Sequence, residues 1–441
     1  MTAPKNRRLL RPLALTAIFF FTVSGGPYGL EPLLSDVGPR LALFALLLVP
    51  LLWSLPVILM VLELNSRFPM TGGYYQWVKI GLGPRWGFYE GWWTWLYALT
   101  DLAIYPVLFV QYTGFFFPGI EAFRIPVCLG VVWVCAGLNI LGIQPVGKSS
   151  IALKAGVILP FLVMAFLPAA GQHQPAAVSP APGFAGISMG LFILMWNYLG
   201  WDSASTIAPE VERPVRSYLL SMFAALAVIV AVYLLALHTG IRTGIDPAEL
   251  RESGFPALGN RIGGWWLGTL VSVGGLASAF GLFLSNLLAI SRVPEAMAAD
   301  RFFPRRMMRL HPRFGTPHWS ILFCALAVSG MVLWQFDDLL IIDVTLYSAA
   351  LFPEFMALIR IRRQRPETPA PFRIPLPVPG LIVLTLLPAV CLGVACAGLC
   401  VNGAVHSMAA LFAAGALLTG PVLWRLLKRN VAPEDRGTPD H

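Results

Sequence analysis

The segment Ser24-Gly25-Gly26-Pro27-Tyr28-Gly29 decides the fold, because it interrupts an apolar run that is otherwise suited to cross a membrane as one helix. Three glycines and a proline near the middle of this run, which covers residues 13–34, prevent continuous helical hydrogen bonding. Non-helical backbone is tolerated at membrane depth only where protein buries it or where it lines a cavity. The sequence therefore predicts a break of that kind in the first membrane helix.

A second apolar run, residues 184–202, ends in a similar interruption. Its segment Asn197-Tyr198-Leu199-Gly200-Trp201-Asp202-Ser203 contains a glycine, an amide and a carboxylate. The two breaks lie five predicted helices apart, and matching breaks in two halves of a chain are typical of inverted repeats with a small-molecule site between them. We therefore predict repeats at residues 13–170 and 184–360, with residues 379–427 forming two further helices. A pair of structural Gly/Pro kinks is the alternative interpretation.

The composition of the chain indicates a membrane protein. Hydrophobic residues make up 57% of the 441 residues and charged residues 12%, and this charged share is about half that of a soluble protein. A soluble enzyme, a disordered regulator and a nucleic-acid-binding protein are therefore excluded. Because the apolar runs are continuous rather than alternating, we predict an all-α bundle and no β-barrel. We predict twelve transmembrane helices, at residues 13–34, 41–64, 86–117, 125–143, 150–170, 184–202, 216–240, 264–293, 317–336, 339–360, 379–400 and 404–427.

The distribution of basic residues predicts the orientation of these helices. If the N-terminal tail, residues 1–12, lies in the cytoplasm, then all but five of the 31 Lys and Arg residues fall in cytoplasmic segments. Twelve helices also place the C-terminal tail, residues 428–441, in the cytoplasm. The net charge of +9 therefore reflects the orientation of the helices in the membrane, and we predict no nucleic-acid partner. We expect this membrane to be the plasma or inner cell membrane. The five outer residues are Arg40, Arg124, Arg242, Arg251 and Arg261.

Motifs for catalysis or cofactor binding are not supported by their context. Residues 142–149 match the GxxxxGKS pattern of a phosphate-binding loop, but they lie in a short turn between two apolar helices, with no strand before them. We therefore predict no ATP binding. The histidines and cysteines show no metal-ligand spacing, and no nucleophile has a base placed beside it. The sequence thus predicts neither a cofactor, nor a metal site, nor an enzyme.

Carboxylates inside membrane helices mark candidate functional residues, since each costs at least ~2.5 kcal/mol to insert. Tyr97, Asp101 and Tyr105 follow one another at intervals of four residues and share a helix face. Asp343 and Tyr347 have the same spacing on a later helix. A hydrogen-bonded structural carboxylate is the alternative interpretation of Asp101.

Other charged residues near helix ends are expected to have structural roles. We expect Glu63 to anchor the loop that follows it. We expect Glu90 to pair with Arg85, and Glu354 to pair with Arg360. Lys154 is expected to extend its ammonium group to the membrane interface, with a role in ion coupling as the alternative.

Several further segments accompany the two breaks, namely Trp53-Ser54-Leu55-Pro56, Phe68-Pro69, Gly72-Gly73-Tyr74, Glu210-Val211-Glu212, residues 311–317 and Pro371-Phe372-Arg373-Ile374-Pro375. Together with the breaks they resemble the amino-acid/polyamine/organocation superfamily, over predicted helices 1 to 10 and the loop beyond. Residues 24–31, and Asp101 followed by Tyr105-Pro106-Val107-Leu108-Phe109, are most similar to its polyamine-uptake branch.

The resemblance implies a leucine-transporter-like fold of five-plus-five inverted repeats with discontinuous helices 1 and 6, alternating access, and proton coupling or exchange. The polyamine-uptake branch carries acidic residues at two positions where this chain has Val57 and Gln111. Because a polyamine carries several positive charges, this departure leaves an amino acid or another amine open as the substrate.

The expected substrate is a small amine-bearing solute, either an amino acid or a polyamine. Freed amides near Gly25, Gly26 and Gly200 would hold a substrate carboxylate, whereas freed carbonyls and Asp101 or Asp202 would hold an amine. The predicted binding residues are Ser24, Gly25, Gly26, Tyr28, Gly29, Tyr97, Asp101, Tyr105, Asn197, Tyr198, Gly200, Trp201, Asp202, Asp343 and Tyr347.

Asp101 is also the candidate for proton coupling, because coupling needs a carboxylate that changes charge between the two access states. The partners expected are therefore the solute, H+ and the lipid bilayer. Exchange is one alternative. Sodium coupling is another, since Ser278 and Ser285 could supply ligands. A channel and a membrane-embedded enzyme are disfavoured, because broken helices are typical of sites that open to both sides.

Overall fold

A computed structural model of the chain describes residues 10–70, 72–142, 148–167, 182–299, 302–367, 369–401 and 407–427. Within these ranges the protein is helical, and its one isolated β-bridge joins Leu10 to Val211. The predicted all-α fold is confirmed. The α-helices are α1 (Pro12–Val23), α2 (Pro32–Val49), α3 (Leu55–Arg67), α4 (Gly73–Leu82), α5 (Pro84–Thr113), α6 (Arg124–Ile140), α7 (Lys148–Phe166), α8 (Phe184–Asn197), α9 (Pro214–Thr243), α10 (Pro247–Gly263), α11 (Trp265–Ala299), α12 (His318–Met331), α13 (Phe336–Gln364), α14 (Val378–Val401) and α15 (Ser407–Leu427). The shorter elements are the π-helix η1 (Pro50–Ser54) and the 3-10 helices η2 (Ile120–Phe123), η3 (Ser203–Glu210) and η4 (Arg305–Met308).

Eight helical segments among the described residues are long and apolar enough to cross a membrane. Four shorter apolar helices lie in the remaining predicted spans, so that each of the twelve predicted spans contains one helical segment. Two of the short helices, α1 and α8, are short because the predicted breaks end them. The count of twelve spans and the inverted repeat stay predictions. The eight long segments are Pro32–Arg67, Pro84–Thr113, Ile120–Ile140, Pro214–Thr243, Trp265–Glu295, Phe336–Gln364, Val378–Val401 and Met408–Leu427.

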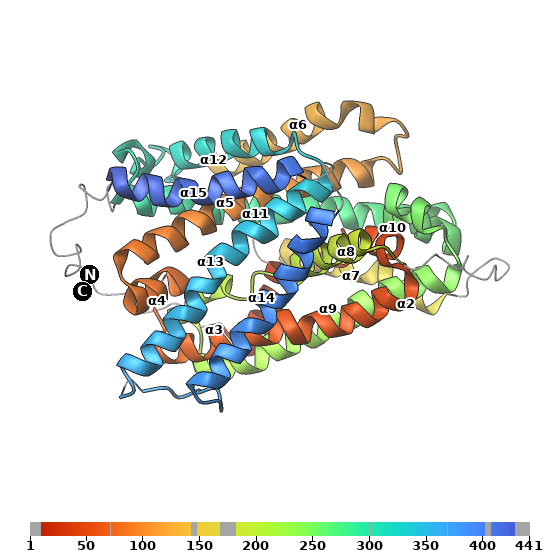
Figure 1. Cartoon of the computed structure of the whole chain (residues 1–441). Coiled ribbons are helices and arrows are strands. Elements are labelled where there is room, and N and C mark those ends of the chain that lie inside the picture. The colour runs from red at the N-terminus through yellow and green to blue at the C-terminus, as the bar shows by residue number, and fades with distance from the viewer. Residues whose placement is uncertain are drawn as a thin grey trace.

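Helices α5 and α13 pack against each other in the core of the bundle, where both are largely buried. Most helices in Figure 1 run along one common direction, while α13 and α14 cross the view at a steeper angle. Helices α14 and α15 are the least buried of the long apolar helices, and they direct many leucine and valine side chains outward. This arrangement places the carboxylates of α5 and α13 together, inside the most deeply buried part of the described chain.

Some sequence predictions fall outside the described residues. They concern residues 143–147 of the segment that matches the GxxxxGKS pattern, most of the N-terminal tail and the whole C-terminal tail. The side chain of Lys154 is also outside the described set.

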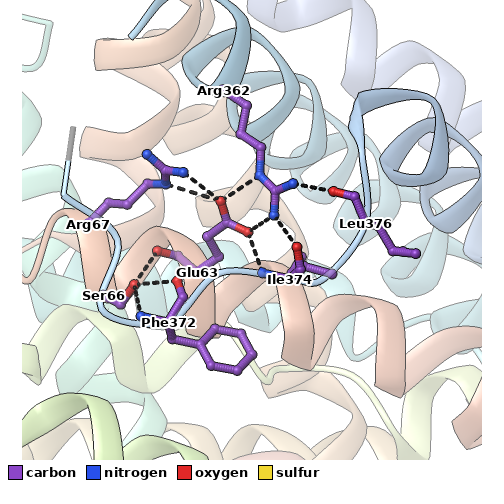
Figure 2. A network of polar contacts seen from close by, with 7 residues as sticks. All are labelled: Glu63, Ser66, Arg67, Arg362, Phe372, Ile374 and Leu376. Atoms are coloured by element: carbon purple, nitrogen blue, oxygen red, sulfur yellow. Dashed lines mark hydrogen bonds and ion pairs between the residues drawn. The ribbon is translucent and has the colours of Figure 1, made fainter. Parts of the chain in front are cut away.

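Glu63 fastens the end of α3 to α13 and to the loop that follows α13 (Figure 2). Its carboxylate is fully buried and accepts hydrogen bonds from Arg67 Nη2 at 3.0 Å, Arg362 Nε at 2.7 Å and the Ile374 amide at 2.9 Å. Arg362 in turn donates to the carbonyl oxygens of Ile374 at 2.8 Å and Leu376 at 2.5 Å. Glu63 is therefore an anchor, but the loop that these contacts hold is the one after α13, whereas the sequence analysis expected the loop directly after Glu63.

We predict that Arg362→Gln lowers the free energy of unfolding by ~3–5 kcal/mol, because it takes one cation from a buried ion pair and two donors from the loop carbonyls. Arg360 lies on the same helix but is exposed and donates to Gln364 at 3.2 Å. Arg360→Gln should therefore change stability by less than ~0.5 kcal/mol. Thermal unfolding of the two purified variants, followed by tryptophan fluorescence, measures the difference. Equal melting temperatures would show that Arg362 does not hold the loop.

Candidate functional site

The first break separates α1 from α2. Helix α1 ends at Val23 and α2 begins at Pro32, and the segment between them contains three glycines with positive φ. The values are +63° for Gly25, +112° for Gly26 and +91° for Gly29. The break predicted from the sequence is thus confirmed at residues 24–31.

The second break lies directly beside the first. Helix α8 ends at Asn197, η3 begins at Ser203, and Gly200 between them has φ of +92°. A Cβ atom on Gly200 would lie 3.3 Å from the carbonyl oxygen of Thr22, in the last turn of α1. The two interruptions therefore share one region of the bundle, as the inverted-repeat prediction requires.

The amides that were expected to bind a substrate carboxylate already have acceptors inside the protein. The acceptors are the Phe20 carbonyl oxygen for Gly25 at 3.2 Å, Ser24 Oγ for Gly26 at 3.1 Å and Tyr347 Oη for Gly200 at 3.3 Å. A carboxylate could bind here only by displacing these contacts. This part of the sequence prediction therefore receives no support from the geometry.

Two carbonyl oxygens at the breaks are held by hydroxyl groups from neighbouring helices. Ser278 Oγ on α11 donates to the Gly25 carbonyl at 2.7 Å, and Tyr233 Oη on α9 donates to the Asn197 carbonyl at 3.0 Å. Ser285, the other serine considered for sodium, donates to a carbonyl of its own helix. The breaks are thus stabilised by side chains that the bundle supplies.

Asp101 lies next to the second break and joins three helices. Its Oδ2 atom accepts a hydrogen bond from Tyr105 Oη at 2.7 Å, and its Oδ1 atom accepts one from Trp196 Nε1 at 3.1 Å. Trp196 is the penultimate residue of α8, and Asn286 on α11 donates to the Tyr105 hydroxyl at 3.3 Å. The predicted pair of Asp101 and Tyr105 is therefore built into the wall of the break.

Asp343 on α13 faces Asp101 on α5. Its side chain is fully buried, and neither of its oxygens accepts a hydrogen bond of ordinary geometry from the described residues. It lies close enough to the backbone and the carboxylate of Asp101 to interact electrostatically. The ion pairs found within the described residues include neither aspartate. Two acidic groups therefore share a buried space without a cation.

Tyr347 connects this acidic pair to the second break. Its hydroxyl donates to Asp202 Oδ1 at 2.8 Å and accepts from the Gly200 amide. Its ring meets the ring of Tyr97 edge to face, with centroids 5.1 Å apart. The structure thus brings together five of the residues predicted to bind the substrate, and their binding role stays a prediction. They are Tyr97, Asp101, Asp202, Asp343 and Tyr347.

Other predicted residues are engaged in tertiary packing. The Tyr28 hydroxyl donates to the Val271 carbonyl at 3.1 Å, and the Tyr198 hydroxyl donates to the Leu46 carbonyl at 3.1 Å. Trp201 is fully buried, and its ring centroid lies 6.2 Å from that of Phe19. These three aromatic residues support the breaks, and their polar contacts do not include the acidic pair.

Glu31 was quoted in the family motif but not predicted as a site residue. It is fully buried at the end of the first break, where Oε2 accepts from the Gly29 amide at 2.6 Å. Its Oε1 atom accepts from Tyr112 Oη at 2.9 Å and from the Phe255 amide of α10 at 3.4 Å. Glu31 therefore ties the break to α5 and α10, and the signal for it was a carboxylate that ends a glycine-rich interruption.

The expected ion pairs of Glu90 and Glu354 are wrong. Arg85 donates to Tyr89 Oη at 2.8 Å, Arg360 donates to a glutamine, and both glutamates are buried. Spacings of five and six residues turn the side chains to different faces of a helix, whereas spacings of three or four keep them together. Both glutamates therefore point into the bundle.

Comparison with known proteins agrees with this architecture. The chain matches the amino acid permease family over residues 10–421, a range that contains both breaks and every predicted site residue. It is 32% identical over 404 residues to polyamine transporter RMV1 of Arabidopsis thaliana, covering 90% of this chain and 82% of the relative. It is 33% identical over 415 residues to polyamine transporter PUT1 of Oryza sativa subsp. japonica, covering 92% and 77%. An uncharacterized transporter of Mycobacterium tuberculosis is 27% identical over 274 residues, or 61% of each chain.

We predict that Gly200→Ala destabilises the protein by at least ~1–2 kcal/mol, because a side chain strains the left-handed backbone and approaches the Thr22 carbonyl. Gly130→Ala on α6 is the matched control, since a Cβ there meets nothing within 4 Å. The control should be neutral or stabilising, by up to ~1 kcal/mol. Thermal unfolding distinguishes the two variants. A Gly200→Ala protein that melts with the wild type would show that the break does not need this backbone conformation.

Proposed function

Because this chain belongs to the amino acid permease family and is a transporter rather than an enzyme, we propose that it carries a polyamine across the cell membrane by alternating access. The proposal includes twelve membrane helices, a five-plus-five inverted repeat and cytoplasmic termini. It also includes coupling to protons through Asp101. The substrate would bind where the two breaks meet α5 and α13.

The acidic pair of Asp101 and Asp343 is the observation that carries this proposal. A buried carboxylate without a cation is unfavourable by several kcal/mol. Asp101 has two hydrogen-bond donors and Asp343 has none of ordinary geometry among the described residues, so the two acids together favour a cationic ligand. An ammonium group has three hydrogen-bond donors and no acceptor, which suits the free oxygens of Asp343. The ligand would thus supply both the charge and the hydrogen bonds that the described residues do not supply.

The same geometry favours a polyamine over an amino acid. An amino acid needs donors for its carboxylate, and the amides of Gly25, Gly26 and Gly200 are occupied. The two relatives from plants are named as polyamine transporters, which supports the same choice. Gln111, at one of the positions where the polyamine-uptake branch is acidic, donates to the Arg251 carbonyl at 3.1 Å. We propose that this position holds α10 and does not bind the substrate.

We predict that Asp101→Asn reduces uptake of labelled spermidine into proteoliposomes by ~10-fold or more, because a charge-assisted contact of ~1.5–3 kcal/mol is lost. Uptake by the variant should also lose its response to an imposed proton gradient. Glu249→Gln is the control, since it removes an exposed carboxylate. A variant that keeps the wild-type rate and proton dependence would remove Asp101 from the mechanism.

Arg251 on α10 is the residue proposed to close the outer side. It forms ion pairs with Asp36 at 2.6 Å and with Asp337 at 2.5 Å, so α10 is tied to the start of α2 and the start of α13. Glu31 holds the same helix through the Phe255 amide. Opening of the outer side would have to break these contacts.

We predict that Arg251→Gln increases hydrogen–deuterium exchange of the α10 amides, since two carboxylates would then repel each other without a cation between them. Arg261→Gln on the same helix is the matched control, because Arg261 is exposed and its contact to Glu249 is 3.9 Å long. The control should exchange like the wild type. Unchanged exchange in Arg251→Gln would contradict its proposed role in closure.

A further inference from the structure

A second group of carboxylates lies further along the helix pair than the acidic pair, toward the N-terminal end of α5 and the C-terminal end of α13. It consists of Glu90, Glu354 and Asp202, and their side chains are almost completely buried. Oε2 of Glu90 and Oε2 of Glu354 have no hydrogen-bond partner within the described part of the chain. Glu354 interacts electrostatically with both Asp202 and Glu90, and the Tyr74 hydroxyl lies near all three. The three carboxyl groups and the Tyr74 hydroxyl therefore lie near one another.

The two acidic groups form two levels on one face of the helix pair. Glu90 precedes Asp101 by 11 residues on α5, and Glu354 follows Asp343 by 11 residues on α13. Eleven residues make slightly more than three helical turns, so the side chains return to nearly the same face ~16 Å away. Because Asp101 faces Asp343 and Glu90 faces Glu354, the helices run antiparallel and the levels match.

The buried arginines that the structure describes do not account for the second level. The buried arginines among the described residues are Arg67, Arg124 and Arg362. Arg67 and Arg362 bind Glu63, and Arg124 donates to carbonyl oxygens at the end of α12. Because these arginines are engaged elsewhere, three neighbouring buried carboxyl groups favour protonation or a cation supplied by a ligand. Thr94 Oγ1 donates to Glu90 Oε1 at 2.7 Å and Tyr347 donates to Asp202, but Oε2 of Glu90 and Oε2 of Glu354 stay without a partner among the described residues. Both oxygens of Glu31, by contrast, accept hydrogen bonds.

We infer that the substrate has a second binding site for an ammonium group, formed by Glu90, Asp202 and Glu354. One long polyamine then occupies both levels. This inference rests on the proposed function and extends it to a substrate class, the tetraamines. Between the levels lie the rings of Tyr97 and Tyr347, whose faces suit methylene segments and ammonium groups. Asp202 accepts a hydrogen bond from Tyr347 and interacts electrostatically with Glu90 and Glu354, so it links the second level to these rings.

The length of the ligand agrees with the spacing of the levels. An extended chain advances ~1.2 Å per bond, so the end nitrogens of spermine, thirteen bonds apart, lie ~16 Å from each other. The nitrogens of putrescine are five bonds apart and reach only ~6 Å. A diamine can therefore occupy one level only, whereas a tetraamine can occupy both.

Competition for uptake of labelled putrescine into proteoliposomes tests the site, with putrescine, spermidine and spermine as unlabelled competitors. Wild-type protein should be inhibited best by spermine. Glu354→Gln and Glu90→Gln should each raise the inhibition constant of spermine ~10-fold and leave that of putrescine within about twofold. Glu121→Gln, which removes an exposed carboxylate, is the matched control and should leave both constants unchanged.

The outcomes separate this site from the proposed function. Both glutamine variants could leave the inhibition constant of spermine unchanged, or raise the inhibition constants of spermine and putrescine by the same factor. Either result overturns the second site, while polyamine transport stands. If the wild type neither takes up nor is inhibited by any of the three amines, the proposed function is overturned together with the site. Two variants are used so that one still tests the second site if the other does not fold. Thermal unfolding of each purified variant checks that it is folded.

Discussion

Backbone hydrogen bonding without water is the constraint on which this structure depends. Each interruption of a helix inside a bilayer frees amides and carbonyls that must find partners in the protein. Here Ser278, Tyr233 and Tyr347, from three different helices, hold the backbone of the two breaks. The breaks therefore cannot form alone, and the packing of α9, α11 and α13 around them is the condition for their existence.

The ends of the bundle and its middle differ in the charges that they carry. At the ends, arginines bridge segments, as Arg362 does at Glu63 and Arg251 does at α10. In the middle, carboxylates outnumber the basic side chains that the structure describes there. A protein that avoided this excess would be more stable, since buried unpaired acids are costly. The excess is understandable if the middle must attract a cation and also release it.

The sequence was sufficient to predict both breaks, because the density of glycine and proline there is incompatible with a helix. It also predicted a functional role for Asp101 and Asp343, since charge inside an apolar helix is costly. It could not show that they face each other, because that depends on the antiparallel packing of α5 and α13. The amides were expected to be free, but local folding gave Gly26 the Ser24 hydroxyl as an acceptor. Glu90 and Glu354 were misassigned because nearness in sequence was taken for nearness on a helix face.

The position of Arg251 has a consequence for how the two halves of the chain cooperate. One guanidinium group binds Asp36, which lies in the first half, and Asp337, which lies in the second. It can satisfy both only when the two halves have converged. In the proposed mechanism, a movement of Asp36 or of Asp337 away from α10 would break one of the two ion pairs of Arg251.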